Sequence, residues 1–226
     1  MAKRKIILIG GGGHCKVVIS ILKKLDNFEI AGISDNYIAG SLISGIKILG
    51  TDDDLKNIYK SGIHYALITV GSIRDNTKRY ELFNMVRKIG FVFPIIISQE
   101  AIVDESVKID EGTIIMPGSI INIDSSIGKN CIINTGSIIE HDCKIGNHCH
   151  IAPGVNISGT VNIDKLSFIG TGATIIQNIK IGKNVTIGAG SVIIKDIPDN
   201  VIAVGNPAKI IKSKKYNLNL KTIDKG

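Results

Sequence analysis

Residues 139–157 read IEHDCKIGNHCHIAPGVNI, and isoleucine occupies every sixth position of this stretch. The same spacing extends in both directions, from Val103 to Ile193, without an insertion. The position four residues after each of these aliphatic residues is mostly small, with Ile179 as the exception. A period of six fits neither the helical repeat nor a long two-residue alternation, but it is typical of short strands that meet at regular corners.

This hexad pattern predicts a β-solenoid with three flat faces. Three hexads form one coil of about 18 residues, and each coil pairs with the next at roughly 4.8 Å. Residues 18 apart in the sequence are therefore expected to stack. A narrow interior filled by aliphatic side chains has no room for rings, and Phe168 is the one aromatic residue between positions 94 and 200. The pattern does not give the hand of the coil, and the general rule for crossovers favours a right-handed one.

The first hundred residues follow a different pattern, that of a small parallel α/β sheet. The glycine-rich stretch GGGGHCK at 10–16 is a tight turn between a strand and a helix. Asp35 follows the second expected strand directly, and Gly71 and Ser72 follow the third. A ligand site is expected where these strand ends meet. The expected strands are 5–9, 28–33, 64–70 and 91–97, and the expected helices are 17–25, one that begins at Leu55, and 74–89.

Composition places the chain among cytoplasmic globular proteins. Of its 226 residues 44% are hydrophobic and 21% charged, which excludes a disordered chain, and no apolar run is long enough for a membrane span. The net charge of +7 is not arranged as a basic stripe interleaved with aromatic rings, so no nucleic-acid partner is expected. Gly10 interrupts the apolar start before it resembles a secretory signal, and four cysteines suit a reducing compartment.

The glycine turn would let a phosphate approach backbone N–H groups at a helix N-terminus. Cys15 occupies the place of the last glycine of the dinucleotide fingerprint, so nicotinamide binding is not expected. Asp35 has two interpretations, a ligand of a ribose hydroxyl or a solvated loop carboxylate. The glycines likewise serve either a ligand or close helix-to-strand packing.

The histidines of the solenoid occupy hexad places that point outward. His141 lies at the third place of its hexad and Asp142 at the fourth, while His148 and His150 take the fourth and sixth places of the next. Gly159 stacks 18 residues beyond His141 and leaves space beside its ring. The pattern leaves two alternatives open, a catalytic base and an ordinary solvated imidazole.

The mixed His and Cys residues are of the types that bind zinc, but their positions within the hexads argue against a zinc site. Cys131, Cys143 and Cys149 occupy the small inward position, whereas the histidines face outward, so they cannot complete one tetrahedron. No metal is expected. After the repeat, residues 201–212 contain a Gly-x-Pro turn followed by lysines, which form either a solvated tail or a clamp for a phosphorylated cofactor.

Together, GGGGHCK (10–16), the unbroken hexads, EHDCKIG (140–146) with His150, and VGNPAK (204–209) resemble the bacterial sugar acetyltransferases of the PglD and NeuD kind. The resemblance implies an α/β plus all-β fold: a Rossmann-like nucleotide-sugar-binding domain over 1–98, a left-handed parallel β-helix over 99–212 and a basic tail over 213–226. It also implies a homotrimer that binds acetyl-CoA between neighbouring β-helices.

In this family resemblance, the acetyl group passes from acetyl-CoA to an amino or hydroxyl group of a nucleotide-linked sugar, such as a UDP-4-amino-4,6-dideoxy sugar. His141 corresponds to the general base, and Asp142 stands where the family usually has the longer Glu. The implied acetyl-CoA residues are His150, Gly159, Gly170, Thr171, Gly188, Ala189 and Lys209. The implied nucleotide-sugar residues are Gly11, Gly13, His14, Asp35, Asn36, Gly71 and Ser72.

Three other functions compete with this interpretation. A sialic acid O-acetyltransferase uses the same chemistry on a hydroxyl group. A γ-carbonic-anhydrase-like metalloenzyme also has a β-helix but needs three zinc-binding histidines, whose spacing this sequence lacks. A non-catalytic nucleotide-sugar-binding module would make His141 incidental.

Overall fold

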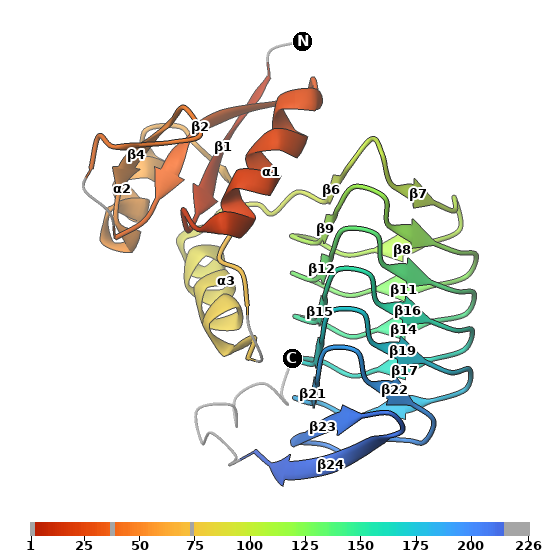
Figure 1. Cartoon of the computed structure of the whole chain (residues 1–226). Coiled ribbons are helices and arrows are strands. Elements are labelled where there is room, and N and C mark those ends of the chain that lie inside the picture. Colours follow the sequence, from red (N-terminus) through yellow and green to blue (C-terminus); the bar gives the residue numbers. More distant parts are fainter. Residues whose placement is uncertain (1–2, 37–38, 73–74, 215–226) are drawn as a thin grey trace.

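The structure is a computed structural model that describes residues 3–36, 39–72 and 75–214. An N-terminal α/β unit, residues 4–89, lies beside a long column of stacked coils, and the chain passes once from one to the other (Figure 1). The predicted fold class, a small parallel sheet followed by a parallel β-helix, is confirmed.

Within the described residues, the N-terminal unit holds a five-stranded sheet in the order β3-β4-β2-β1-β5. Neighbouring strands are parallel except for the β3–β4 hairpin. The sequence pattern does not predict this hairpin, because β3 is too short to show an alternation of apolar and polar residues. The strands are β1 (Arg4–Ile9), β2 (Phe28–Ser34), β3 (Leu42–Ile43), β4 (Ile46–Gly50) and β5 (Tyr65–Ile68).

The helices of this unit are α1 (Gly13–Lys24), the short 3-10 helix η1 (Asp52–Asp54), α2 (Leu55–Lys60) and α3 (Thr77–Ile89). Helix α1 starts earlier than the expected position 17, because the end of the glycine turn is itself helical. Gly10 needs its lack of a side chain: its φ is +102°, and a Cβ there would lie 2.4 Å from Cγ2 of Val70. The turn therefore brings the start of α1 against the end of β5.

The prediction that 91–97 completes the N-terminal sheet is wrong. Val92 forms one isolated bridge with Tyr65, and β6 (Ile96–Ile97) pairs with β9 of the β-helix. Pro94, which has no N–H to donate, interrupts the extended segment between these two pairings. The β-helix thus begins before the expected boundary at residue 99, and its last strand, β24, ends at Ser213 rather than 212.

The coils form a prism with three faces, and successive strands pass to successive faces. The first face contains β7 (Ile102–Val103), β10 (Ile120–Ile121), β13 (Ile138–Ile139), β16 (Asn156–Ile157), β19 (Thr174–Ile175) and β22 (Val192–Ile193). The second contains β8 (Lys108–Ile109), β11 (Ser126–Ile127), β14 (Lys144–Ile145), β17 (Asn162–Ile163) and β20 (Lys180–Ile181). The third contains β6, β9 (Ile114–Ile115), β12 (Ile132–Ile133), β15 (His150–Ile151), β18 (Phe168–Ile169), β21 (Thr186–Ile187), β23 (Val201–Gly205) and β24 (Ala208–Ser213).

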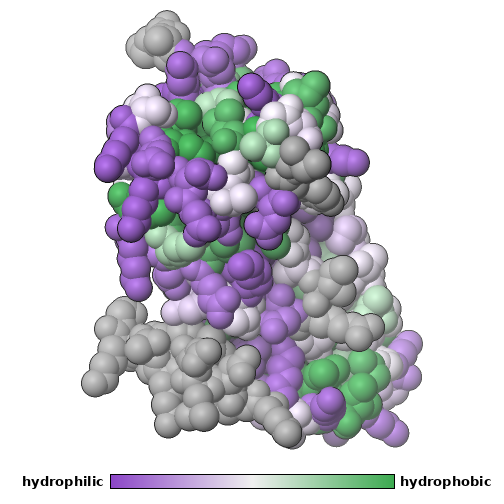
Figure 2. Space-filling view, turned by 90° about the vertical axis from the view of Figure 1, so that its left-hand side faces the viewer, coloured by the Kyte–Doolittle hydropathy of each residue, from purple (hydrophilic) through white to green (hydrophobic). Residues whose placement is uncertain are grey.

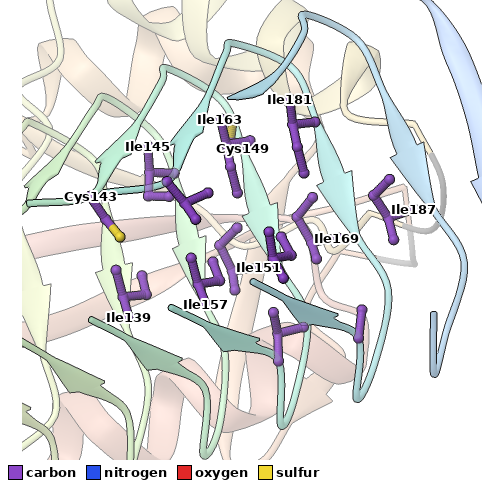
Figure 3. Close-up of a cluster of buried hydrophobic side chains, with 14 of the residues drawn as sticks. Ile139, Cys143, Ile145, Cys149, Ile151, Ile157, Ile163, Ile169, Ile181 and Ile187 are labelled. Carbon is purple, nitrogen blue, oxygen red and sulfur yellow. The ribbon is translucent and has the colours of Figure 1, made fainter. Parts of the chain in front are cut away.

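The strand register confirms that residues 18 apart stack. Ile121 pairs with Ile139, and Ile139 pairs with Ile157, all in parallel. The hexad isoleucines from Ile115 to Ile193 are no more than 3% exposed and fill the prism (Figure 3). Each contributes about 1.5–3 kcal/mol through burial, so this ladder is the main source of stability in the β-helix. The left hand of the coil remains a prediction from the family resemblance.

The outer sides of the three faces differ, and the difference decides what each can contact. Outward residues of the second face are polar, whereas the first face is mixed: it presents Ile102, Ile120, Ile138 and Val192 together with Asn156 and Thr174. The third face is covered by the N-terminal unit, so that the outward residues Ile114 and Ile132 are buried. The side of the molecule that carries this unit is largely hydrophilic, with separate hydrophobic patches (Figure 2). No helix in the described part of the chain is long and apolar enough to cross a membrane.

Truncation of one ladder residue should destabilise the protein in proportion to the volume removed. Ile151 is fully buried, so Ile151→Ala is expected to lower the free energy of unfolding by about 2–5 kcal/mol, and Ile151→Val by about 0.5–1.5 kcal/mol. Urea denaturation followed by circular dichroism measures both values. Equal stability of the two variants and the parent would contradict the assignment of Ile151 to a close-packed core.

Candidate functional site

His148 and His150 point away from the prism interior, as predicted, but neither is solvated. Their exposed fractions are 9% and 7%, because the N-terminal unit covers the third face and the edge beside it. Tyr80 of α3 packs edge-on against the His148 ring, and Phe168 packs edge-on against the His150 ring. The alternative of an ordinary solvated imidazole is therefore wrong for both residues. The hexad pattern could not show their burial, because the unit that covers them lies far away in the sequence.

The hydrogen bonds of His150 define its tautomer. Asn134 accepts the N–H of Thr135 with its Oδ1 atom, so its amide nitrogen faces His150 and donates to Nε2 at 3.1 Å. Nδ1 then carries the proton and donates to the Ser72 hydroxyl at 2.8 Å. Burial, with a smaller effect of the Arg79 charge, lowers the pKa of His150 to about 3. This imidazole is neutral at pH 7 and links the N-terminal unit to the β-helix.

The glycine turn and the strand ends meet as predicted. The Gly11 N–H donates to Oδ2 of Asp35 at 2.5 Å, so Asp35 is held against the turn instead of extending into solvent. A Cβ on Gly71 would lie 3.4 Å from Cβ of His14, the second residue of α1. Burial, followed by the charge of Arg79, lowers the pKa of His14 well below its usual value.

Two further predicted sugar residues, Gly13 and Asn36, also lie at this end of the sheet. Gly13 begins α1, and a side chain there would meet open space. Asn36 is exposed and directly follows Asp35. The structure thus gathers the predicted nucleotide-sugar residues at the carboxyl ends of β1, β2 and β5, where a ligand can approach the helix N-terminus.

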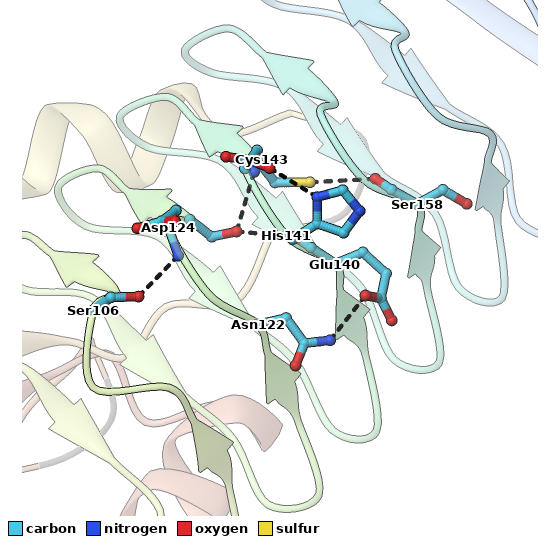
Figure 4. Close-up of polar contacts among 9 residues, drawn as sticks. Ser106, Asn122, Asp124, Glu140, His141, Cys143 and Ser158 are labelled. Atoms are coloured by element: carbon cyan, nitrogen blue, oxygen red, sulfur yellow. Dashed lines mark hydrogen bonds and ion pairs between the residues drawn. The ribbon is translucent and has the colours of Figure 1, made fainter.

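His141 occupies a different part of the molecule, the edge that joins the first face to the second. Its Nδ1 lies 2.8 Å from Oδ2 of Asp142, and the side chains are 53% and 56% exposed (Figure 4). Asp142 adopts a φ of +58°, which brings its short side chain back to the ring. Gly159 stacks next to His141: a Cβ there would lie 2.4 Å from Nε2. The predicted space beside the ring is present, and the ring fills it.

The remaining predicted acetyl-CoA residues lie on the opposite edge of the first face. This edge joins the third face to the first, and it carries Thr171 and Ala189, which are both exposed. Gly170 and Gly188 have structural reasons to be glycine, since side chains there would collide with the Ala189 backbone and with Val204. Lys209 is exposed on β24. One chain therefore does not bring these residues next to His141.

The cysteines are consistent with a packing role. Cys131, Cys143 and Cys149 are buried inside the prism, and burial raises the pKa of Cys131 to about 12. Across residues 3–36, 39–72 and 75–214, no group of His, Cys, Asp and Glu is arranged to hold a metal ion.

Sequence reasoning missed several polar residues at the contact between the two parts of the chain. These are Asn134, which donates to His150, and Asn76, Arg79 and Asn130. Asn76 donates to the carbonyl of Ser167, and Arg79 donates to Oδ1 of Asn130. An asparagine at a solenoid corner and an arginine in a helix are ordinary on their own. The sequence carries no signal that they face each other across the interface.

Comparisons with known proteins agree with this division of the chain. Residues 5–86 match the PglD N-terminal domain, and residues 124–159 and 161–195 match the bacterial transferase hexapeptide repeats. No curated protein sequence matches. Such a combination defines a hexapeptide-repeat acyltransferase with an added nucleotide-binding-type domain.

Solved structures narrow the class. A perosamine N-acetyltransferase from Caulobacter crescentus, a histidine-to-asparagine variant in complex with CoA and GDP-perosamine, is 36% identical with a TM-score of 0.86; the alignment covers 94% of this chain and 99% of that one. The acetyltransferase domain of PglB from Neisseria gonorrhoeae, in complex with acetyl coenzyme A, is 33% identical with a TM-score of 0.85 over 93% and 100% of the two chains. WeeI from Acinetobacter baumannii is 29% identical with a TM-score of 0.81 over 92% and 100%. The chain belongs to the family of sugar acetyltransferases of the PglD and NeuD kind.

The buried histidines predict an acid-sensitive fold. His148 and His150 each have a pKa lowered from 6.5 to about 3, so below pH 6.5 the unfolded chain binds protons that the folded chain does not. Stability is complete above pH 6.5 and should fall by about 1 kcal/mol per pH unit for each histidine as the pH drops toward 3. Urea denaturation at pH 7.5, 6 and 5 measures this slope. In His148→Gln the slope should decrease by the share of one histidine, while His150 still contributes its own. An unchanged slope in this variant would refute the contribution of His148.

Proposed function

We propose that this protein transfers an acetyl group from acetyl-CoA to the amino group of a nucleotide-linked sugar, such as a UDP-4-amino-4,6-dideoxy sugar. The observation that carries the proposal is the His141–Asp142 pair, exposed on one edge of the β-helix with its ring seated on Gly159. The ligands of the related perosamine enzyme, CoA and GDP-perosamine, support the same two substrate classes. The two substrates and the protein all belong to the cytoplasm in this proposal.

His141 acts as the general base. The Asp142 carboxylate accepts a hydrogen bond, so Nδ1 of His141 carries the proton and the Nε2 lone pair is available. The sugar amine attacks the thioester carbonyl carbon, and Nε2 takes the proton that this nitrogen loses. The C–S bond then breaks, the CoA thiolate is protonated, and the N-acetylated sugar and CoA thiol leave. No covalent enzyme intermediate is required.

The nucleotide part of the acceptor binds at the strand ends of the N-terminal unit. The backbone N–H of Gly13 at the start of α1 is suited to a phosphate of the nucleotide, whereas the N–H of Gly11 already donates to Asp35. Asp35 and Asn36 lie at the end of β2, where a ribose or base would reach. The sugar then extends past His14 and Gly71 toward Ser72, close to the neutral His150.

The site is completed by a second copy of the chain in a homotrimer. His141 and the Thr171–Ala189 edge lie on opposite sides of the first face, where Ile102 is exposed and Ile120 and Ile138 are partly exposed. The Thr171–Ala189 edge has glycine with φ between +65° and +70° at every αL position, whereas the other two edges mostly have residues with side chains there, with Gly112 as an exception. Side chains on most of these glycines would meet open space within the chain. Because these glycines carry no side chain, acetyl-CoA and the neighbouring β-helix would be able to approach this edge closely. The αL glycines are Gly118, Gly136, Gly154, Gly172 and Gly190.

The acetyl-CoA contacts follow from this arrangement. The pantetheine arm would run along Gly159 of one copy and along Gly170, Thr171, Gly188 and Ala189 of the next. His150 would lie near the thioester, and Lys209 on the exposed hairpin strand would pair with the coenzyme phosphates.

Release of free thiol from acetyl-CoA tests the proposal when it is measured against a panel of UDP-, GDP- and CMP-linked amino sugars and free sialic acid. Turnover with an amino-sugar nucleotide supports it. Turnover with sialic acid alone would replace it by sialic acid O-acetylation, and tight nucleotide-sugar binding without thiol release would identify a binding module.

Loss of the base should slow the reaction without unfolding the protein. His141→Ala removes a half-exposed side chain, so the melting temperature should change little, while kcat falls by about 10²–10⁴. Asn122→Ala is a control for disturbance of this edge. It breaks the hydrogen bond from Asn122 to the Glu140 carboxylate on the next coil, which has no part in the proposed reaction. A rate of His141→Ala close to the parent's would remove His141 from the mechanism.

Mixed trimers should regain activity that two inactive variants lack. Ala189→Trp blocks the glycine edge but leaves His141 intact, whereas His141→Ala leaves the Ala189 edge open. After random mixing of equal amounts, about a quarter of the clefts combine two intact edges. Refolding the variants together should therefore restore about a quarter of the parent activity, and light scattering should report a trimer. Mixtures as inactive as the separate variants would refute a shared site.

A further inference from the structure

Arg79 is a buried cation without a carboxylate partner. Its side chain is 2% exposed, yet no ion pair within the described ranges includes it. Its guanidinium donates only to neutral oxygens: the carbonyls of Ile68 at 2.8 Å and Val70 at 2.6 Å, and both Oδ1 and the carbonyl of Asn130. A buried charge of this kind is costly, and burial lowers the pKa of Arg79 to about 10.

The oxygens that Arg79 binds belong to two different parts of the chain. Ile68 and Val70 are at the carboxyl end of β5, immediately before Gly71 and Ser72 of the sugar pocket. Asn130 lies in the β-helix, at the edge between the second and third faces. One planar group with fixed donor directions thus clamps the strand end that carries the sugar pocket onto the β-helix.

The clamp also orients the imidazoles. Asn130 accepts from Arg79 with Oδ1 at 2.8 Å, which turns its amide nitrogen toward Nδ1 of His148 at 3.0 Å. His148 must therefore keep its proton on Nε2. On the other side, the strand end held by Arg79 leads directly to Ser72, which accepts from His150.

The charges around these rings are of one sign. The Arg79 charge acts on three rings, those of His14, His148 and His150, and the charges of Lys129 and Lys165 also act on His148. After burial, Arg79 is the largest of the effects that lower each of these pKa values. No carboxylate contributes to the lowered pKa values of these three rings.

We propose that Arg79 is the positioning residue of the acceptor site: it fixes Gly71 and Ser72 against the β-helix and, through Asn130 and Ser72, holds His148 and His150 in defined tautomers and orientations. This proposal rests on the proposed function, because it assigns Arg79 to the sugar side of the same reaction. Arg79 does not touch the reacting atoms; it acts through Ser72 and Asn130.

The test compares Arg79→Met, which removes the charge and the donors, with Arg79→Lys, which keeps the charge but cannot span both parts of the chain. Arg87→Met is the matched control: Arg87 also lies on α3 and bridges to the β-helix through Glu111, but its side chain is 50% exposed. Histidine titration is followed by NMR without substrates, and kcat and KM are measured separately for each substrate.

In Arg79→Met, the pKa of at least one of the buried histidines should rise above its value in the parent, because one positive charge is gone while burial still lowers it. The value of kcat/KM for the nucleotide sugar should fall about 10²-fold, while KM for acetyl-CoA changes less than about threefold. In Arg79→Lys, the histidines should stay neutral, while kcat/KM for the nucleotide sugar still falls at least about tenfold. Arg87→Met should match the parent in both measurements.

Titrations and kinetic constants of Arg79→Met that equal those of Arg87→Met would overturn the proposal. If Arg79→Met does not fold, a parent-like kcat/KM in folded Arg79→Lys would overturn it equally. Absence of acetyl transfer in the parent would refute the proposed function, whereas the titration arm would still decide whether Arg79 controls the histidines.

Discussion

Parallel pairing of each coil with the coil 18 residues later is the constraint on which the rest of the structure depends. It places Ile121, Ile139 and Ile157 above one another, and it equally fixes every outward residue in a column. His141 faces Gly159 for this reason alone. Because one skipped residue would shift each following column, the unbroken hexad phase fixes the position of His141 along with the core.

The second organising contact is between the N-terminal unit and the third face. It converts His148 and His150 from outward residues into buried, neutral ones, and it connects Ser72 to the β-helix. Side chains, and not only the short connection between the two parts, thereby hold the N-terminal unit and the β-helix in a fixed relation. Arg79 is buried in this contact and brings a positive charge into it, and no carboxylate among the described residues forms an ion pair with it.

The two halves of the proposed chemistry belong to different edges of the prism. A base on one edge and a thioester groove on the other cannot meet within one rigid column, because the whole first face separates them. A closed ring of copies solves this geometrical problem, since each edge then meets the opposite edge of a neighbour. The apolar residues of the first face and the glycine edge, which lacks side chains at its αL positions, are both suited to that assembly.

The sequence by itself determined the β-helix, its inward isoleucines, the direction of the histidines, the contact between His141 and Gly159, and the meeting of Gly11 with Asp35. These follow from local periodicity, which survives in any environment. Only the tertiary structure decided that β6 joins the β-helix, that His148 and His150 are buried, and that Arg79 pairs with Asn130. The burial of the histidines and the Arg79–Asn130 pair depend on contacts between residues more than fifty positions apart, and no repeat or spacing in the chain shows which surfaces meet. The pairing of β6 with β9 spans 18 residues but lies before the hexad run that the sequence shows.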